Sequence, residues 1–290
     1  MQQLHIPDSL AAACRHNAST RTWLQRLPEQ IRELETRWSL RFAEPFTNHE
    51  GSCSWVAPVS LPDNTSAVLK LAMPHMEGEH EIEGLCFWNA DPTVQLLAYD
   101  TNVGAMLLGR CHPGTSLRAQ PESEQDVVLA RLLKRMWRMP PTPHSFRHLR
   151  LMTTHWSRET MAAASAWPDE GIVKEGLRLF QTLTEPAASD VLLATDLHAG
   201  NVLRAQREEW LVIDPKPFIG DPAYDATQHL FNCEQRLQKA PEETICRFAD
   251  LLSIDRERIR LWTFARAAAE PRDNWTNDWA FQLARALAPK

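Results

Sequence analysis

The spacing of apolar residues changes partway along the chain, and its first part follows a helical period. Ile31, Leu34 and Trp38 recur at intervals that place them on one face of a helix, and Pro28 suits the first turn of that helix. Three short helices are therefore predicted over residues 1–38, the last of them beginning at Pro28.

The next stretch consists of short, mostly apolar segments that are separated by polar links of the kind found in turns. This pattern predicts an antiparallel meander that contains one helix. The predicted strands span 39–47, 54–61, 66–72, 94–99 and 105–110, and the helix spans 76–89.

Pro113 and Gly114 then interrupt regular structure, and the pattern beyond them is mainly helical. Helices are predicted at 122–138, 146–164 and 169–184 and again from Pro222 onward, with one strand-rich segment at 190–214. The whole predicts an α+β fold in two lobes. We expect an N-terminal lobe over 1–110, including the helical extension, and a C-terminal lobe over 111–290.

Composition narrows the class of protein. The net charge of -6 and the pI of about 6.0 argue against a general nucleic-acid-binding protein, which would carry a basic face, and are compatible with a cationic substrate. None of the six cysteines forms a C-x-x-C pair, so we expect buried free thiols in a reducing compartment rather than a zinc site or disulfides.

The chain shows neither an N-terminal secretory pattern nor an apolar run of about 18 residues. We therefore expect a cytoplasmic protein that acts on a small molecule, with no nucleic acid and no membrane as partner. Its oligomeric state is not readable from the sequence.

Two short apolar segments in the strand-rich region each end at an aspartate. The first leads into Asp196-Leu197-His198-Ala199-Gly200-Asn201, and the second is Trp210-Leu211-Val212-Ile213-Asp214. Phosphoryl transfer needs a group that orients the attacking hydroxyl and hard oxygen ligands for a divalent cation. Asp196 suits the first task, and Asn201 with Asp214 suits the second.

The D-x-x-x-x-N spacing alone is a weak signal, because a chain of this length contains it about once by chance. When the motif is taken alone, an aspartate in a turn and an asparagine that caps a strand end explain it better. The wider context, an apolar strand on each side and a second strand ending in Ile-Asp-Pro, favours the catalytic interpretation.

The sequences 196–203 and 210–216 resemble the catalytic and metal-binding loops of the aminoglycoside/hydroxyurea phosphotransferase family. The segments 59–70, 107–115 and 220–225 resemble further parts of that family in the same order, so the resemblance covers about residues 40–280. It implies a protein-kinase-like fold with an antiparallel sheet and one helix in the first lobe. It also implies transfer of the γ-phosphate of ATP, with Mg²⁺, to an alcohol group of a small molecule.

The resemblance implies a role for each matching position. Lys70 would contact the α- and β-phosphates, with Glu81 as its partner and Glu79 as the second choice. Asp225 would brace the catalytic loop. Residues that would bind the nucleotide through loop or hinge positions are Ser52, Leu108, Arg110 and Cys111. The alternatives, which the context makes the less favoured interpretations, are a solvated strand end for Lys70 and a solvated helix charge for Glu81.

One departure from the family pattern stands beside the catalytic aspartate. The family usually has His-Gly there, and this chain has Ala194-Thr195. Thr195 can supply one hydrogen bond but cannot replace an imidazole. The change motivates a rival hypothesis, a pseudokinase that binds nucleotide without turnover.

The acceptor and the reaction class each leave more than one possibility open. The acceptor is expected to be aminoglycoside-like, of the streptomycin type, but a sugar, an amino sugar or hydroxyurea fits the loop equally. A metal-dependent hydrolase with Asp196, His198 and Asp214 as ligands is a third class, although His198 suits packing better than metal binding.

Aromatic and acidic residues gather near the C-terminus. They suit either an acceptor pocket, through stacking and ion pairing with a cationic substrate, or ordinary core and surface. We favour core and surface for Trp262, Trp275, Trp279, Glu270, Asp273 and Asp278.

Overall fold

The computed structural model describes residues 5–15, 17–44, 46, 53–275 and 278–289. The chain divides into two compact units. The first comprises Met1–Gly114 with Arg204–Ile213, and the second comprises Thr115–Leu203 with Asp214–Lys290. The lobe boundary predicted from the sequence, after residue 110, lies close to the end of the segment Met1–Gly114. The sequence gives no indication that residues 204–213 belong to the first unit.

The first unit is built on a five-stranded sheet in the order β1-β2-β3-β5-β4. All neighbouring strands are antiparallel, and Lys70 in the middle of β3 lies opposite Val56 and Met106. The strands are β1 (Arg41–Phe42), β2 (Ser54–Ser60), β3 (Ser66–Ala72), β4 (Leu96–Asp100) and β5 (Ala105–Gly109).

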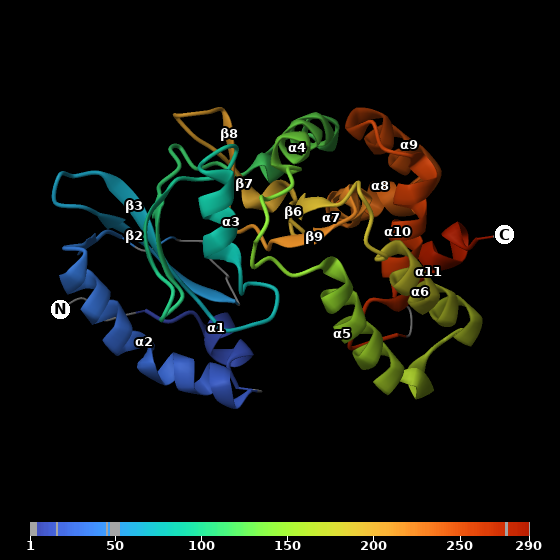
Figure 1. Ribbon diagram of the computed structural model, residues 1–290, viewed down its shortest axis with the longest axis horizontal. Coiled ribbons are helices and arrows are strands. Elements are labelled where there is room, and N and C mark those ends of the chain that lie inside the picture. Colours follow the sequence, from blue (N-terminus) through green and yellow to red (C-terminus); the bar gives the residue numbers. More distant parts are fainter. Residues whose placement is uncertain (1–4, 16, 45, 47–52, 276–277, 290) are drawn as a thin grey trace. The chain divides into compact units, whose positions relative to one another are not determined.

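Helices cover both faces of this sheet. Alternate residues of a strand point to opposite faces. Leu69 and Leu71 of β3 therefore pack with α2 (Ala18–Arg37), whereas Val68 and Ala72 pack with α3 (Glu81–Trp88). Figure 1 shows these two helices on either side of β2 and β3. A short helix, α1 (Asp8–Ala13), precedes α2 and adds Leu10 to the same core.

The helix α2 corrects the prediction that a helix begins at Pro28, because Pro28 lies inside one continuous helix of 20 residues. A proline inside a helix removes a hydrogen bond and costs about 3 kcal/mol. Here Trp23, Leu27, Ile31 and Leu34 form an uninterrupted buried stripe on the helix. Each such side chain contributes about 1.5–3 kcal/mol on burial, so the stripe outweighs the proline.

Three further predicted boundaries are wrong. The strand expected at 39–47 contains only Arg41–Phe42, although parts of that range lie outside the described residues. The helix expected from 76 begins at Glu81, and the strand expected at 94–99 runs from Leu96 to Asp100.

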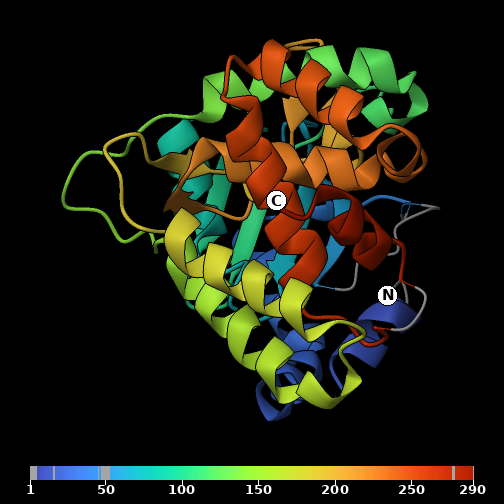
Figure 2. The same ribbon diagram turned by 90° about the vertical axis from the view of Figure 1, so that its right-hand side faces the viewer.

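The second unit is mainly helical, with α10 at its centre. This helix packs against α6, α7, α9 and α11, and Figure 2 shows α6 beside α5. The helices are α4 (Glu122–Met136), α5 (Leu149–Ala162), α6 (Glu170–Leu183), α7 (Pro222–Asn232), α8 (Glu234–Lys239), α9 (Pro241–Leu252), α10 (Arg256–Ala269) and α11 (Trp279–Leu287). Its core includes an edge-to-face contact of Tyr224 with Trp262, whose ring centroids are 5.2 Å apart.

Short strands in the second half of the chain frame the predicted catalytic segment. β6 (Val191–Leu193) pairs antiparallel with β9 (Phe218–Gly220), which leads directly into α7. β7 (Val202–Arg204) follows the catalytic segment, and β8 (Trp210–Val212) precedes Asp214. The pairing of β6 with β9 brings residues 194–196 close to the start of α7, although the two are far apart in sequence.

In the described part of the chain, none of the helices has the length and apolar character needed to cross a membrane. The cysteines are free thiols, as expected, but only Cys14 and Cys233 are buried. Cys53 and Cys86 are exposed, so the expectation that the thiols are all buried is wrong.

Candidate active site

Asp225 of α7 holds the segment that leads to Asp196. Its carboxylate accepts hydrogen bonds from the backbone N–H groups of Ala194 and Thr195 at 3.0 and 2.8 Å and from the indole of Trp137 at 3.0 Å. Burial raises the pKa of the Asp225 carboxyl to about 6, and these three donors act against that shift. Asp225 thus braces the loop, which is the role that the sequence predicts for it.

Thr195 has a left-handed backbone conformation, with φ of 48°. This region favours glycine and is strained for a β-branched residue, which explains why the family usually has glycine here. The Thr195 hydroxyl compensates by donating a 2.6 Å hydrogen bond to the carbonyl of Lys216, while its N–H is held by Asp225. Ala194, at the position of the family's histidine, is completely buried and is fixed through its backbone.

We expect Thr195→Val to lower the free energy of unfolding by about 1–3 kcal/mol, because the variant keeps the strained backbone and removes the hydroxyl that donates to the part-buried carbonyl of Lys216. Urea denaturation measures this. The matched control is Thr182→Val on the exposed side of α6, where the change should stay within about 0.5 kcal/mol. An equal effect of both substitutions would contradict the assigned hydrogen bond.

The carboxylate of Asp196 accepts a hydrogen bond at each oxygen. The amide nitrogen of Gln228 lies 2.8 Å from Oδ1, and the ammonium group of Lys216 forms a short ion pair with Oδ2. Arg266 donates to the amide oxygen of Gln228 at 3.0 Å. Because a guanidinium can only donate, this contact fixes which end of the amide faces Asp196.

Arg266 is itself held rigidly in α10. It bonds Thr227 at 2.8 Å and Glu270 at 2.9 Å, and its guanidinium carbon lies 5.0 Å from the ring centres of Tyr224 and Phe231. Such stacking fixes a planar cation in the interior. The orientation of Asp196 is therefore set by a chain of contacts that runs back into the helical core.

Asn201 follows Asp196 through a single turn of 3₁₀-helix, Ala199–Asn201. Its side-chain nitrogen donates to the carbonyl of Asp196 at 3.0 Å, which turns its amide oxygen away from that contact. Asp214 has φ of 53°, a conformation that aspartate tolerates better than most residues. Its charge acts on His198, so the two side chains belong to one electrostatic environment.

His198 is neutral in this arrangement. The N–H of Gly200 donates to its Nδ1 at 3.0 Å, so the proton lies on Nε2, which is 4.0 Å from Asp196. Burial lowers the pKa of the imidazole, although the charge of Asp196 acts in the opposite direction. With Nδ1 engaged by backbone, His198 acts as a cap for the 3₁₀ turn, which supports packing over metal binding.

Lys70 and Glu81 form a buried ion pair in the first unit. The ammonium group lies 2.6 Å from both carboxylate oxygens, and the two residues are 6% and 3% exposed. Glu81 is the first residue of α3, whereas Glu79 precedes the helix. The geometry thus pairs Lys70 with Glu81, the first of the two partners predicted for it.

The predicted hinge residues end β5 and continue beyond it. Leu108 is buried in the sheet, and burial raises the pKa of the Cys111 thiol to about 11. The N–H of Gly109 donates to the carbonyl of Gln95 at 2.8 Å, and that of Arg110 to Ser66 at 3.4 Å. The remaining predicted nucleotide-binding residue, Ser52, lies outside the described residues.

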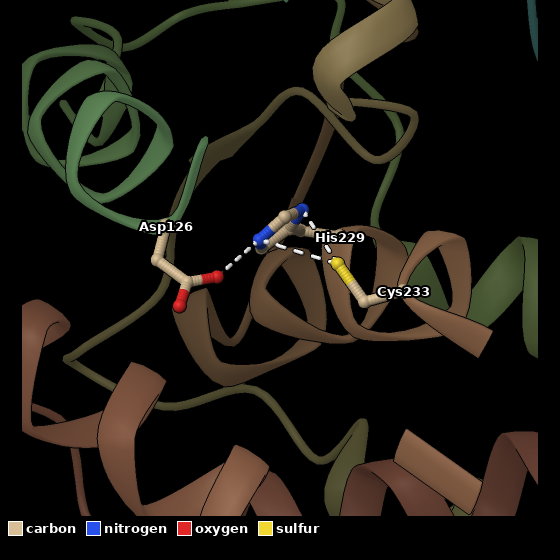
Figure 3. A group of neighbouring side chains, drawn as sticks. All are labelled: Asp126, His229 and Cys233. Atoms are coloured by element: carbon tan, nitrogen blue, oxygen red, sulfur yellow. Dashed lines mark hydrogen bonds and ion pairs between the residues drawn. The ribbon is translucent and has the colours of Figure 1, made fainter. Parts of the chain in front are cut away.

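Asp126, His229 and Cys233 form a second cluster, drawn in Figure 3. It is the one set of three His, Cys, Asp or Glu ligand atoms within 4.8 Å in the parts of the chain that the structure describes. A cation would meet strong competition there, because Arg236 and Arg247 both donate to the Asp126 carboxylate at 2.7–2.8 Å. Burial also raises the pKa of the Cys233 thiol to about 12. We therefore interpret this cluster as an internal ionic network.

The side chains invoked for a metal-dependent hydrolase are arranged differently. Asp196, His198 and Asp214 do not form a comparable cluster among the residues that the structure describes. The engaged Nδ1 of His198 also argues against a role as metal ligand.

The sequence-family model of the aminoglycoside/hydroxyurea antibiotic resistance kinases matches residues 37–276 of this chain. The chain belongs to this family. It is 32% identical over 276 residues to a streptomycin 6-kinase of Streptomyces glaucescens, covering 91% of this chain and 88% of that protein. It is 35% identical over 258 residues to a hydroxyurea phosphotransferase of Kitasatospora aureofaciens, covering 86% of this chain and 73% of that protein.

Solved structures of other small-molecule kinases share the fold of this kinase. A choline kinase from Streptococcus pneumoniae superimposes with a TM-score of 0.61 at 11% identity, covering 90% of this chain and 97% of that one. The predicted protein-kinase-like α+β fold is confirmed. As a member of the family, the kinase is a phosphotransferase whose acceptor is a hydroxyl group.

Most of the C-terminal aromatic and acidic residues make contacts within the second unit. Trp262 is completely buried and donates to Asp221 at 2.7 Å, and Trp275 is 3% exposed. Trp279 packs against Phe231. The carboxylates of Glu270 and Asp278 form ion pairs with Arg266 and Arg272, and Asp273 is exposed. These contacts favour the core and surface interpretation over an acceptor pocket.

Proposed function

We propose that this kinase transfers the γ-phosphate of ATP to a hydroxyl group of an aminoglycoside-like acceptor of the streptomycin type, in the cytoplasm. The strongest support is the likeness, over 91% of the chain, to streptomycin 6-kinases. The arrangement around Asp196 supports an active kinase rather than a pseudokinase, because the departure at Ala194-Thr195 is compensated by Asp225 and by the Thr195 hydroxyl.

In this proposal Asp196 orients the acceptor hydroxyl and takes its proton. A new bond forms between the acceptor oxygen and the γ-phosphorus as the bond to the bridging oxygen breaks, and ADP leaves. Lys216 and Gln228 are both hydrogen-bond donors, so the oxygens of the Asp196 carboxylate act as acceptors. A group that must receive a proton needs such acceptor oxygens.

A divalent cation would be held by Asn201 and Asp214. The donor set fits Mg²⁺, which prefers hard oxygen ligands, because the amide nitrogen of Asn201 is already engaged and its oxygen remains as the ligand atom. When bound, Mg²⁺ would neutralise charge on the phosphates. Lys70, held by Glu81, would contact the α- and β-phosphates, and the segment of Leu108, Arg110 and Cys111 would contact adenine.

The test is an ADP-release assay with ATP and a panel of acceptors: streptomycin, further aminoglycosides, hexoses, amino sugars and hydroxyurea. We expect turnover with streptomycin and a phosphorylated product of matching mass. Nucleotide binding without turnover on the whole panel would instead favour the pseudokinase.

Hydroxyurea is the second candidate acceptor, because the kinase is as similar to a hydroxyurea phosphotransferase as to the streptomycin kinases. The catalytic loop meets only a hydroxyl and therefore does not separate the two. The ratio of kcat/KM values for the two acceptors decides between them.

We expect Gln228→Leu to lower kcat about tenfold with little change in the KM for ATP, because one hydrogen bond to Asp196 is worth about 1.5 kcal/mol. The matched control is Gln238→Leu on the exposed face of α8, which should retain parental kcat. A parental kcat in Gln228→Leu would show that the amide does not position Asp196. A similar loss in both variants would point to a general effect on folding.

A further inference from the structure

Lys216 is bound to three consecutive residues of the catalytic segment. Its backbone N–H donates to the carbonyl of Ala194 at 2.9 Å, and its own carbonyl accepts the 2.6 Å hydrogen bond from the Thr195 hydroxyl. Its ammonium group forms the short ion pair with Oδ2 of Asp196. Because both backbone groups are fixed, the side chain starts from a defined position and places its charge beside the Asp196 carboxylate.

The side chains of this ion pair can be reached from solvent. That of Lys216 is 16% exposed and that of Asp196 is 21% exposed, whereas Lys70 and Glu81 are buried. The charge of Lys216 is therefore partly withdrawn from water without being enclosed. Such a charge acts on a bound partner more strongly than a fully exposed one, because water and salt screen it less.

The geometry of phosphoryl transfer brings the γ-phosphoryl group close to this ammonium group. A hydroxyl that is oriented by a carboxylate lies about 2.6–3.2 Å from it, and the reacting oxygen and phosphorus are about 3–3.5 Å apart. Because Lys216 contacts the same carboxylate, a hydroxyl held by Asp196 brings the phosphoryl oxygens within reach of the flexible lysine side chain. An ammonium group has three rotatable donors, so it can bridge a carboxylate and a phosphoryl oxygen.

The γ-phosphoryl group needs a cation at this place. Negative charge spreads over its three equatorial oxygens in the transition state. In the proposed function Lys70 contacts the α- and β-phosphates, and Asn201 and Asp214 hold the metal. These roles leave the equatorial oxygens without a donor from a charged side chain.

We propose that Lys216 is a further catalytic residue, whose ammonium group contacts an oxygen of the γ-phosphoryl group during transfer. This assignment rests on the proposed function, in which Asp196 orients the acceptor. As the acceptor oxygen bonds to the γ-phosphorus and the bond to the ADP oxygen breaks, the acceptor proton passes to Asp196. Lys216 keeps its own protons and stabilises the charge on the group that moves.

The test compares two complexes that differ only in a mimic of the phosphoryl group. Mg²⁺ and ADP are titrated into the protein by calorimetry, with and without aluminium fluoride, which together with ADP resembles the phosphoryl group in transfer. We expect Lys216→Met to leave the Kd for Mg²⁺ and ADP within about twofold and to weaken the aluminium fluoride complex about 10- to 100-fold, because a hydrogen bond from a charged group is lost. Lys216→Arg, which keeps the charge, should recover part of the loss.

Turnover gives a second measurement. With streptomycin as acceptor, Lys216→Met should lower kcat at least about tenfold and change the KM for streptomycin by less than about threefold, because the contact is made in the transition state. Lys216→Gln replaces this variant if it does not fold. The matched control is Lys174→Met, which removes an exposed lysine paired with Glu170 on α6 and should match the parent in both assays.

A double substitution separates contact with the phosphoryl group from positioning of Asp196. A lysine that acted only through Asp196 would have no effect once that carboxylate is absent. We therefore compare Asp196→Ala with the variant that carries both Asp196→Ala and Lys216→Met. The second substitution should weaken the aluminium fluoride complex by a further fivefold or more, about the effect of one hydrogen bond.

Two results would overturn the assignment of Lys216. One is equal affinity of the parent and a folded Lys216 variant for the aluminium fluoride complex. The other is the absence of any further weakening when Lys216 is replaced in Asp196→Ala. Either result leaves the proposed function intact, because the parent still turns over. A parent that neither turns over on the acceptor panel nor forms the aluminium fluoride complex would remove the proposed function, and this assignment with it.

Discussion

Replacing Asp196 with alanine is expected to lower kcat by about 10²–10⁴-fold while leaving the affinity for ATP close to parental. The loss of kcat is expected because a positioned base contributes about this much to proton transfer. The affinity for ATP should be kept because Asp196 contacts Gln228 and Lys216, and not Lys70, which is assigned to the α- and β-phosphates. Nucleotide affinity is measured by calorimetry with ATP and Mg²⁺, and turnover by ADP release.

Asp214→Ala provides the contrast. As a proposed metal ligand, Asp214 should be needed for binding of the metal–nucleotide complex as well as for turnover, so both measurements should fall. Asp250→Asn, at an exposed carboxylate of α9, is the control and should match the parent in both. Parental activity in both site variants would remove the catalytic assignment, and an identical loss of ATP affinity in both would remove the division of roles.

The sequence carries most information where function depends on residues close together in the chain. Asp196 and Asn201 are joined by one 3₁₀ turn, and Asp214 follows a short buried strand, so a local pattern includes all three. Lys70 and Glu81 lie on adjacent elements, β3 and α3, whose order and spacing the sequence also shows. Their spacing alone is a weak signal, however, and the roles assigned to them rest on the resemblance of several segments to one family.

The residues that position Asp196 had no comparable signal. Gln228 lies one helical turn after Asp225, so a shared face of α7 offered a weak indication. Arg266 is on α10, and its contact with Gln228 depends on how two helices pack. A buried arginine looks like a surface residue in sequence until its stacking and ion-pair partners are known.

The helix α2 shows the same limit in the fold itself. Local rules made Pro28 a helix start, which is its usual position. The outcome was decided instead by Trp23, Leu27 and Ile31, whose burial against the sheet stabilises one long helix. The free energy gained by burying these side chains exceeds the cost of about 3 kcal/mol for a proline inside a helix. A local sequence pattern does not show how much apolar surface a helix will bury.

Asp126→Asn is expected to lower the free energy of unfolding by about 3 kcal/mol at pH 7. Asp126 is completely buried and accepts hydrogen bonds from Arg236, Arg247 and His229. Removing one partner of a buried ion pair costs about 3–5 kcal/mol, and partial exposure of both arginines moves the expectation to the lower end. The exposed Asp250→Asn is again the control, with a change below about 0.5 kcal/mol.

The pH dependence distinguishes this ionic role from a packing defect. Burial opposes ionisation of Asp126, but hydrogen bonds from Arg236, His229 and Arg247 outweigh it and hold the pKa of the carboxyl below its usual value. The stabilisation is therefore fully present above the unfolded-state pKa of about 4 and is lost as the pH falls toward the lower folded-state pKa. The difference in the free energy of unfolding between parent and Asp126→Asn should shrink over that acidic range in urea denaturation, whereas a packing defect would leave it constant.

Because His229 is adjacent to Gln228 on α7, loosening this network should also reduce kcat through the contact that orients Asp196.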